Sequence, residues 1–222
     1  MTARGKLILI EGLDRAGKTT QCALLRERLE AECGVDNVIV QKLPDRTTNI
    51  GKTINSYLSC GTELDDRAVH LLFSANRWEL RSFLLDSLRG GKTIILDRYV
   101  PSGVAYSLAK EIPGMSLEWC LAPERGLPVP DVTIFLDINP ANADVLSSRE
   151  GFGIERYELS EFQSAVRSKF KTLLGDSTIA GVLKWDNVVT VDATNDINTV
   201  AETISKAIEE VSDLDEDVKC IE

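Results

Sequence analysis

The chain carries a phosphate-binding loop motif directly after a short apolar run. Residues 12–19 read Gly-Leu-Asp-Arg-Ala-Gly-Lys-Thr, which fits G-x-x-x-x-G-K-[ST], and they follow Leu7–Ile10. In this pattern the glycines let the backbone fold around phosphate oxygens, and the following helix points its first N–H groups at the anion. Lys18 would reach the terminal phosphates, and the Thr19 hydroxyl would ligate Mg²⁺. A plain glycine-rich turn is the alternative, but the strand before the motif and the helical pattern after it favour nucleotide binding.

Short apolar runs alternate with helical periodicities along the rest of the chain. The runs typical of buried parallel strands are Leu7–Ile10, Val38–Leu43, Thr93–Leu96, Val132–Leu136 and Val188–Val191. Between them, apolar residues recur at three- and four-residue steps, as a helix requires. We therefore predict an α/β fold with a doubly wound, five-stranded parallel sheet flanked by helices.

The domain organisation follows from length and composition. A chain of 222 residues without repeats or linkers predicts one domain, over residues 1–212. The acidic residues 213–222 predict a disordered tail. Residues 147–158 are rich in charge and punctuated by glycine, which is typical of a short lid that closes over a substrate. An ordinary exposed loop has the same composition, so both interpretations stay open here.

The overall charge excludes some classes of function. The net charge is −10, whereas a protein that binds polynucleotides usually has a basic face, so we expect no polynucleotide partner. No apolar stretch approaches the ~20 residues of a membrane helix, and the first strand leaves no room for a signal peptide. We expect no membrane partner and a cytosolic or nuclear location. His70, the only histidine, has apolar neighbours, and we interpret it as a packed or exposed bystander.

Charged residues gather where the predicted strands end. Arg46 follows the second run, Asp97 and Arg98 follow the third, and Asp192 follows the fifth. Ligands of such folds bind beyond the carboxyl ends of the strands. Beside a phosphate loop, a carboxylate there can hold Mg²⁺ and an arginine can bridge phosphates. Solvated strand ends or a local ion pair would give the same pattern.

Phe73 and Arg77 lie four residues apart on a predicted helix and so share one face. An aromatic ring can stack on a base while a guanidinium donates to a base carbonyl, which is one way to recognise a pyrimidine. An ordinary core phenylalanine and a surface arginine have the same spacing. The spacing alone leaves both interpretations open.

Four segments resemble, in order, the eukaryotic-type thymidylate kinases, a family of phosphate-loop nucleoside monophosphate kinases. They span Gly5–Gln21, His70–Glu79, Asp97–Tyr106 and Gly151–Glu158. The resemblance implies transfer of the γ-phosphoryl group of ATP to dTMP, giving dTDP and ADP, with Mg²⁺ as the cofactor. It also implies a homodimer. The family commonly has Phe-Pro-Glu-Arg after the second strand, where this chain has Leu43-Pro44-Asp45-Arg46.

The resemblance also implies roles for the matching residues. The implied catalytic residues are Arg15, Lys18, Asp97 and Arg98, and Arg15 would act on the transferring group from inside the phosphate loop. The implied ATP-binding residues are Gly12, Arg15, Ala16, Gly17, Lys18, Thr19, Thr20, Arg149 and Asp192. The implied dTMP-binding residues are Asp14, Arg46, Phe73, Arg77, Arg98, Ser102, Gly103, Tyr106 and Tyr157. Thr19 and Asp97 would hold the metal.

Two other functions compete with this one. A regulatory GTPase shares the phosphate loop, but the Asn-Lys-x-Asp that reads guanine is absent from the sequence. The only Asp-x-x-Gly of a GTPase switch is Asp14–Gly17, inside the phosphate loop itself. A kinase for a broader range of deoxynucleoside monophosphates, or for nucleosides, is the closer alternative, and tolerance for dUMP stays open.

Overall fold

The central sheet agrees with the predicted fold. A computed structural model describes residues 4–138, 156–175, 185, 187–211 and 217–222. Within these residues, five parallel strands lie in the order β2-β3-β1-β4-β5. The strands are β1 (Leu7–Gly12), β2 (Val38–Lys42), β3 (Thr93–Asp97), β4 (Val132–Asp137) and β5 (Val188–Asp192). The α/β class and the five predicted strands are confirmed, with shifts of one or two residues at some strand ends.

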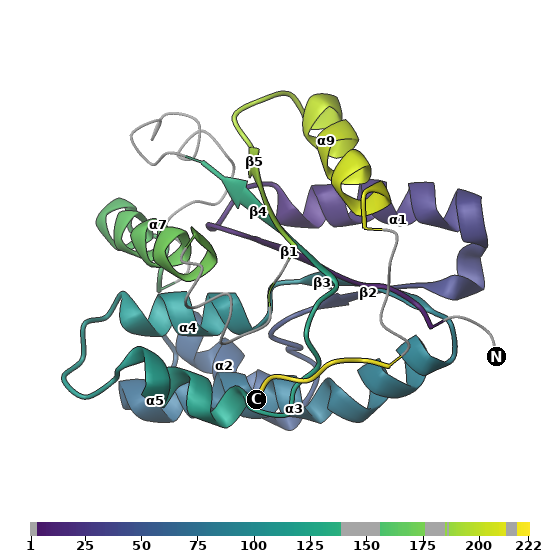
Figure 1. The fold of residues 1–222 in the computed structure, drawn as a ribbon. Helices are drawn as coiled ribbons and strands as arrows, with labels where there is room; N and C mark the ends of the chain where they lie inside the picture. The colour runs from purple at the N-terminus through teal and green to yellow at the C-terminus, as the bar shows by residue number, and fades with distance from the viewer. Residues whose placement is uncertain (1–3, 139–155, 176–184, 186, 212–216) are drawn as a thin grey trace.

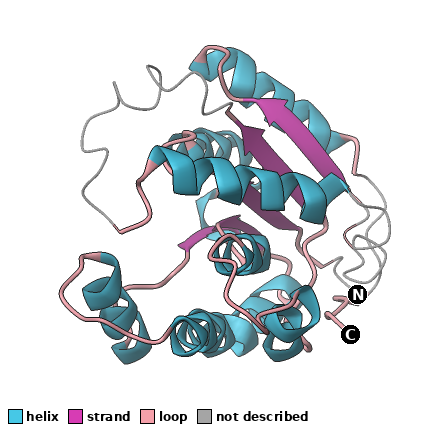
Figure 2. Ribbon diagram, turned by 90° about the vertical axis from the view of Figure 1, so that its left-hand side faces the viewer, coloured by secondary structure: helices cyan, strands magenta, loops and turns pink. Residues whose placement is uncertain are grey.

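Helices cover both faces of the sheet (Figures 1 and 2). On one face lie α1 (Lys18–Cys33) and α9 (Ile197–Glu209). On the other lie α3 (Asp66–Arg89), α4 (Val100–Leu108), α5 (Leu117–Leu121) and α7 (Ser160–Gly175), with α2 (Asn49–Leu58) packed against α3. Short 3₁₀ turns span Val35–Asn37 and Ala122–Glu124. None of the described helices combines the length and the low charge content that a membrane span needs.

Strand β1 is buried on both faces and supplies both halves of the core. Successive side chains of a strand point to opposite faces, so Leu7 and Leu9 pack toward α3, α4 and α7. Ile8 and Ile10 pack toward α1 and α9. All four side chains are fully buried. This explains why the strand reads as a continuous apolar run rather than an alternating one.

The register of the strands places the predicted charged residues at one edge of the sheet. Ile10 of β1 pairs with Asp97 of β3, and Gly12 pairs with Leu136 of β4. At the far side of the sheet, Asp137 pairs with Asp192 of β5. The phosphate loop, Asp97 and Asp192 therefore all leave the sheet at its carboxyl edge.

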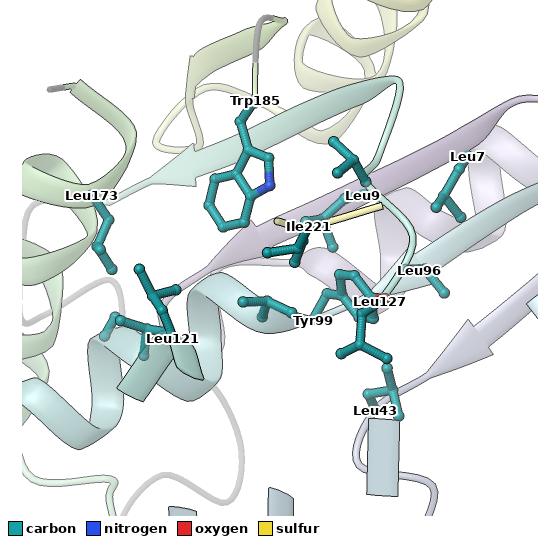
Figure 3. Close-up of a cluster of buried hydrophobic side chains, with 14 of the residues drawn as sticks. Leu7, Leu9, Leu43, Leu96, Tyr99, Leu121, Leu127, Leu173, Trp185 and Ile221 are labelled. Carbon is teal, nitrogen blue, oxygen red and sulfur yellow. The ribbon is translucent and has the colours of Figure 1, made fainter. Parts of the chain in front are cut away.

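The end of the chain differs from the predicted disordered tail at residues 217–222. The Ile221 N–H donates to the Leu127 carbonyl at 2.9 Å, and the Ile221 carbonyl accepts from the Gly126 N–H at 2.7 Å. Figure 3 shows the Ile221 side chain among Leu9, Leu127 and Trp185 of the core. The acidic residues before Ile221 make the whole segment read as a solvated tail. In the structure the Ile221 side chain is only 4% exposed, and its burial stabilises an ordered chain end. The tail residues 213–216 lie outside the described residues.

Candidate active site

A cavity of about 570 Å³ lies at the carboxyl edge of the sheet. Its walls come from the phosphate loop, the segment after β2, helices α3 and α4, and the residues before α7. The predicted site residues that line it are Asp14, Arg15, Gly17, Lys18, Thr19, Thr20, Arg46, Phe73, Arg77, Asp97, Arg98, Ser102, Gly103, Tyr106 and Tyr157. Segments from distant parts of the sequence therefore meet in one place.

The other predicted site residues lie elsewhere. Gly12 and Ala16 are buried at the base of the phosphate loop, where a Cβ on Gly12 would lie 2.7 Å from the Leu136 carbonyl oxygen. Asp192 is exposed at the end of β5, and its Oδ1 accepts from the N–H of Thr194 at 3.0 Å. Arg149 and the lid residues 147–155 lie outside the described residues.

The phosphate loop takes an unusual backbone path. Arg15 has φ 62° and Gly17, the N-cap of α1, has φ 93°. A non-glycine residue rarely adopts positive φ, and such residues concentrate at active sites. Arg98 directly after β3 has φ 72°, so both predicted catalytic arginines stand on strained backbone.

Lys18 lies buried beneath the loop. Its Nζ donates to the Leu13 carbonyl at 2.6 Å. Burial, together with the nearby positive charge of Arg98, lowers the pKa of Lys18 to about 8 against the attraction of Asp14 and Asp97. Burying a charged amine with a single carbonyl partner is unfavourable, so a bound phosphate would stabilise the charged form of Lys18.

Thr19 and Asp97 form a small oxygen-rich site beside Lys18. The Thr19 hydroxyl donates to Asp97 Oδ2 at 2.7 Å. Asp97 Oδ1 is buried and accepts no hydrogen bond from any described residue. The part of the chain that the structure describes contains no cluster of three or more His, Cys, Asp or Glu side chains that could hold a metal. One carboxylate and one hydroxyl fit Mg²⁺, because this ion takes most of its ligands from water and substrate phosphates.

Asp14 fastens the phosphate loop to two helices. Its Oδ1 pairs with the Arg98 guanidinium. Its Oδ2 accepts from the Tyr106 hydroxyl of α4 at 2.9 Å and from Gln163 Nε2 of α7 at 2.7 Å. Although burial alone would raise the pKa of Asp14, Arg98 and Lys18 hold that pKa below its usual value. The carboxylate therefore stays ionised and keeps the loop in place.

Glu11 holds the turn that carries Arg98. It is fully buried, and its Oε1 accepts from the N–H groups of Tyr99 at 2.8 Å and Ser102 at 3.1 Å. Burial raises the pKa of Glu11, opposed by Arg98 and by these hydrogen bonds. The Arg98 guanidinium in turn donates to the Gly12 carbonyl at 3.2 Å. β1 thus fixes the position of the arginine on the neighbouring strand.

Arg77 is fixed by a buried carboxylate. Only 3% of Arg77 is exposed, and its Nε and Nη2 donate to Glu124 at 2.8 and 2.5 Å. A Cβ on Gly103 would lie 2.7 Å from Arg77 Nη2, so the guanidinium rests directly on that glycine. Arg77 is therefore no surface residue, and it lines the cavity together with Phe73.

Several residues that hold the site residues in place are not predicted by the sequence. Asn76 is fully buried and holds the segment that carries Arg46, because its Oδ1 accepts from the Asp45 N–H at 2.7 Å. Glu158 lines the cavity and accepts from Arg15 Nε at 3.1 Å. Glu11, Gln163 and Glu124 belong to the same group. Glu11 could have been predicted, because it is a charged residue directly after the apolar run Leu7–Ile10. The other residues of this group belong to no sequence motif or spacing that would indicate their role.

Comparisons with known proteins agree with this geometry. The family model described as thymidylate kinase matches residues 10–204. The chain is 43% identical to the thymidylate kinase of Danio rerio over 215 residues, which cover 97% of this chain and 92% of the relative. It is 42% identical to that of Schizosaccharomyces pombe over 209 residues, 94% of each chain. It is also similar to the solved thymidylate kinase of Candida albicans, with a TM-score of 0.86, 40% identity and 100% coverage of both chains.

We predict that Glu124→Leu strongly destabilises the fold. The change leaves the Arg77 guanidinium buried without its partner, which lowers the free energy of unfolding by about 3–5 kcal/mol. Urea unfolding measures the change. Glu63→Ala is the control, because it breaks an exposed ion pair with Arg156 and should change stability little. An unfolding midpoint for Glu124→Leu equal to that of the control would contradict the prediction.

Proposed function

The chain belongs to the thymidylate kinase family, and we propose how its residues carry out that family's reaction. It transfers the γ-phosphoryl group of ATP to dTMP and releases dTDP and ADP, a step in nucleotide biosynthesis. The strongest support for the residue roles is the cavity itself. It brings the phosphate loop together with Arg15, Arg46 and Arg98 and with the pair Phe73 and Arg77.

The donor nucleotide binds along the phosphate loop. Lys18 and the loop amides hold the phosphates of ATP, and the loop glycines Gly12 and Gly17 permit the tight path. Ala16, Thr20, Asp192 and Arg149 complete the proposed ATP side. Thr19 and Asp97 would hold Mg²⁺, which when bound neutralises charge on the phosphates. The buried, unpartnered Asp97 Oδ1 supports this assignment.

The acceptor nucleotide binds across α3 and α4. Phe73 stacks on the thymine ring, and Arg77 donates to a ring carbonyl, with Gly103 beneath its guanidinium. Arg46 and Arg98 grip the phosphate of dTMP, as the guanidinium fork suits. Asp14, Ser102, Tyr106 and Tyr157 complete the proposed dTMP side, around the sugar and the base.

The chemistry needs positioning and charge rather than a strong base. A phosphate oxygen of dTMP is the nucleophile, and it is largely ionised near neutral pH because its second pKa is about 6. Arg15, a residue of the phosphate loop, lines the cavity and donates to Glu158 at 3.1 Å, and it stabilises the charge of the transferring group. Lys18 and Arg98 add positive charge from the same cavity.

We propose a homodimer, as the family resemblance implies, and a location in the cytosol or nucleus with no polynucleotide partner, as the composition and charge predict. A second candidate is a kinase with a wider range of acceptors. The similar structure from Candida albicans is described as revealing the origin of broad substrate specificity, which favours testing that range directly.

We predict that the wild-type chain releases ADP when supplied with ATP, Mg²⁺ and dTMP. A coupled ADP-release assay compares dTMP with dUMP, UMP, dCMP and a blank without acceptor. We expect a higher kcat/KM with dTMP than with dCMP, because the Arg77 guanidinium suits the O4 carbonyl, which uracil shares with thymine and cytosine lacks. Equal rates with all acceptors would favour the broader kinase, and no rate above the blank would refute the activity.

We predict that Arg15→Ala lowers kcat by about 10³-fold or more, because one well-placed arginine contributes about 10³–10⁵ in rate to phosphoryl transfer. The KM for dTMP should change much less. Lys52→Gln, on the exposed surface of α2, is the control and should keep wild-type kinetics. A near-normal kcat for Arg15→Ala would sink the proposed role.

We predict that ATP binds more weakly as the pH rises above about 8. The unliganded folded chain loses the Lys18 proton there because its pKa is lowered to about 8, whereas bound phosphates favour the charged form. Binding then takes up a proton, and the dissociation constant rises by up to about tenfold per pH unit. Calorimetric titration between about pH 7 and 10 measures the dissociation constant of ATP. A dissociation constant that does not change across this range would contradict the prediction.

A further inference from the structure

His70 is buried between α3, α4 and α5, with both ring nitrogens in hydrogen bonds. Nδ1 lies 2.7 Å from the Ser107 hydroxyl oxygen, and Nε2 lies 2.9 Å from the Cys120 carbonyl oxygen. The ring also packs against Trp119, with centroids 5.2 Å apart. The proposed phosphoryl transfer has no need of this imidazole, yet Ser107 lines the cavity.

The two contacts fix the direction of the hydrogen bonds. A carbonyl oxygen can only accept, so His70 Nε2 must carry its hydrogen toward Cys120. A neutral imidazole has one N–H, and Nδ1 is therefore an acceptor that takes the hydrogen of the Ser107 hydroxyl. Burial lowers the pKa of His70, and the positive charge of Arg77 lowers it further against Glu124 and backbone carbonyls. The ring is therefore neutral near pH 7.

Ser107 consequently faces the cavity as an acceptor. Its single hydroxyl hydrogen is used by His70, so only lone pairs remain for a ligand. Ser107 follows Gly103 by one turn on the same face of α4, and the Arg77 guanidinium rests on Gly103. An acceptor and a donor, Ser107 and Arg77, thus line the same part of the cavity.

We propose that His70 orients Ser107 as an acceptor-only contact that, with Arg77, selects pyrimidines with a ring N–H beside a carbonyl. Thymine and uracil present N3–H and O4, which match an acceptor and a donor. Cytosine presents a bare N3 and an amino group, so both contacts would be mismatched. Ser107 is the specificity-determining residue and His70 a positioning residue. This inference rests on the proposed function, since it assumes that the acceptor base occupies this cavity.

The test compares dTMP with 5-methyl-dCMP, which differ only at ring positions 3 and 4. We measure kcat and KM for both in the wild type and in Ser107→Ala, Ser107→Thr and His70→Phe. Ser107→Ala removes the acceptor, and His70→Phe frees the hydroxyl to rotate and donate. Both should lower the preference for dTMP by about tenfold or more, mainly through KM. Ser107→Thr keeps the hydroxyl and should keep the preference.

Ser74→Ala is the matched control. Ser74 is also buried on α3, donates to the Pro123 carbonyl at 3.1 Å and does not line the cavity, so its loss should leave the preference unchanged. The inference is overturned if Ser107→Ala keeps the wild-type preference for dTMP over 5-methyl-dCMP, or if Ser74→Ala loses that preference to the same extent. If His70→Phe does not fold, the two Ser107 variants decide. No dTMP turnover by the wild type would instead refute the proposed function.

Discussion

The ion pair between Arg98 and Asp14 joins the exits of two neighbouring strands. Arg98 leaves β3 and Asp14 belongs to the loop after β1, so their pairing sets the distance between the phosphate loop and the α4 turn. Glu11 strengthens the same junction from inside β1 through the N–H groups of Tyr99 and Ser102. The cavity depends on this junction, because α4 carries both Ser102 and Tyr106 into it.

The junction concentrates opposite charges where water is scarce. Glu11, Lys18 and Asp97 are buried, and Arg98 and Asp14 are partly buried. Unpaired charges in such a place would be strongly unfavourable. Arg98 pairs directly with Asp14, while Glu11 accepts from backbone N–H groups and Lys18 donates to a carbonyl. A site that is already charged and fixed needs little reorganisation when phosphates enter, which is the basis of electrostatic catalysis in phosphoryl transfer. The pKa of Lys18 is lowered to about 8 mainly by burial and also by the positive charge of Arg98, so a bound phosphate would favour the charged lysine.

Local sequence patterns predict the fold well, but they do not predict the residues that hold the site residues in place. The apolar run Leu7–Ile10 and the phosphate-loop pattern suffice for the first strand and its turn, because burial and backbone conformation are local properties. Glu124 and Gln163 could not be found this way, since each acts through a partner that is close only after folding: Arg77 lies 47 residues from Glu124, and Asp14 lies 149 from Gln163. Ile221 was missed because the acidic run before it masks its apolar contact with the core.

The unpartnered oxygen of Asp97 links stability to binding. Asp97 Oδ1 is buried and, among the described residues, has no hydrogen-bond donor, which costs about 1–3 kcal/mol in a folded chain. The Thr19 hydroxyl donates only to the other carboxylate oxygen, Oδ2. Lys42 Nζ also lies nearest to Oδ2, at 4.0 Å. A cation at this position removes the penalty, and any ligand that binds only the folded state stabilises it by mass action. In the proposed Mg²⁺ complex, the carboxylate that destabilises the free chain would therefore favour the nucleotide-bound one.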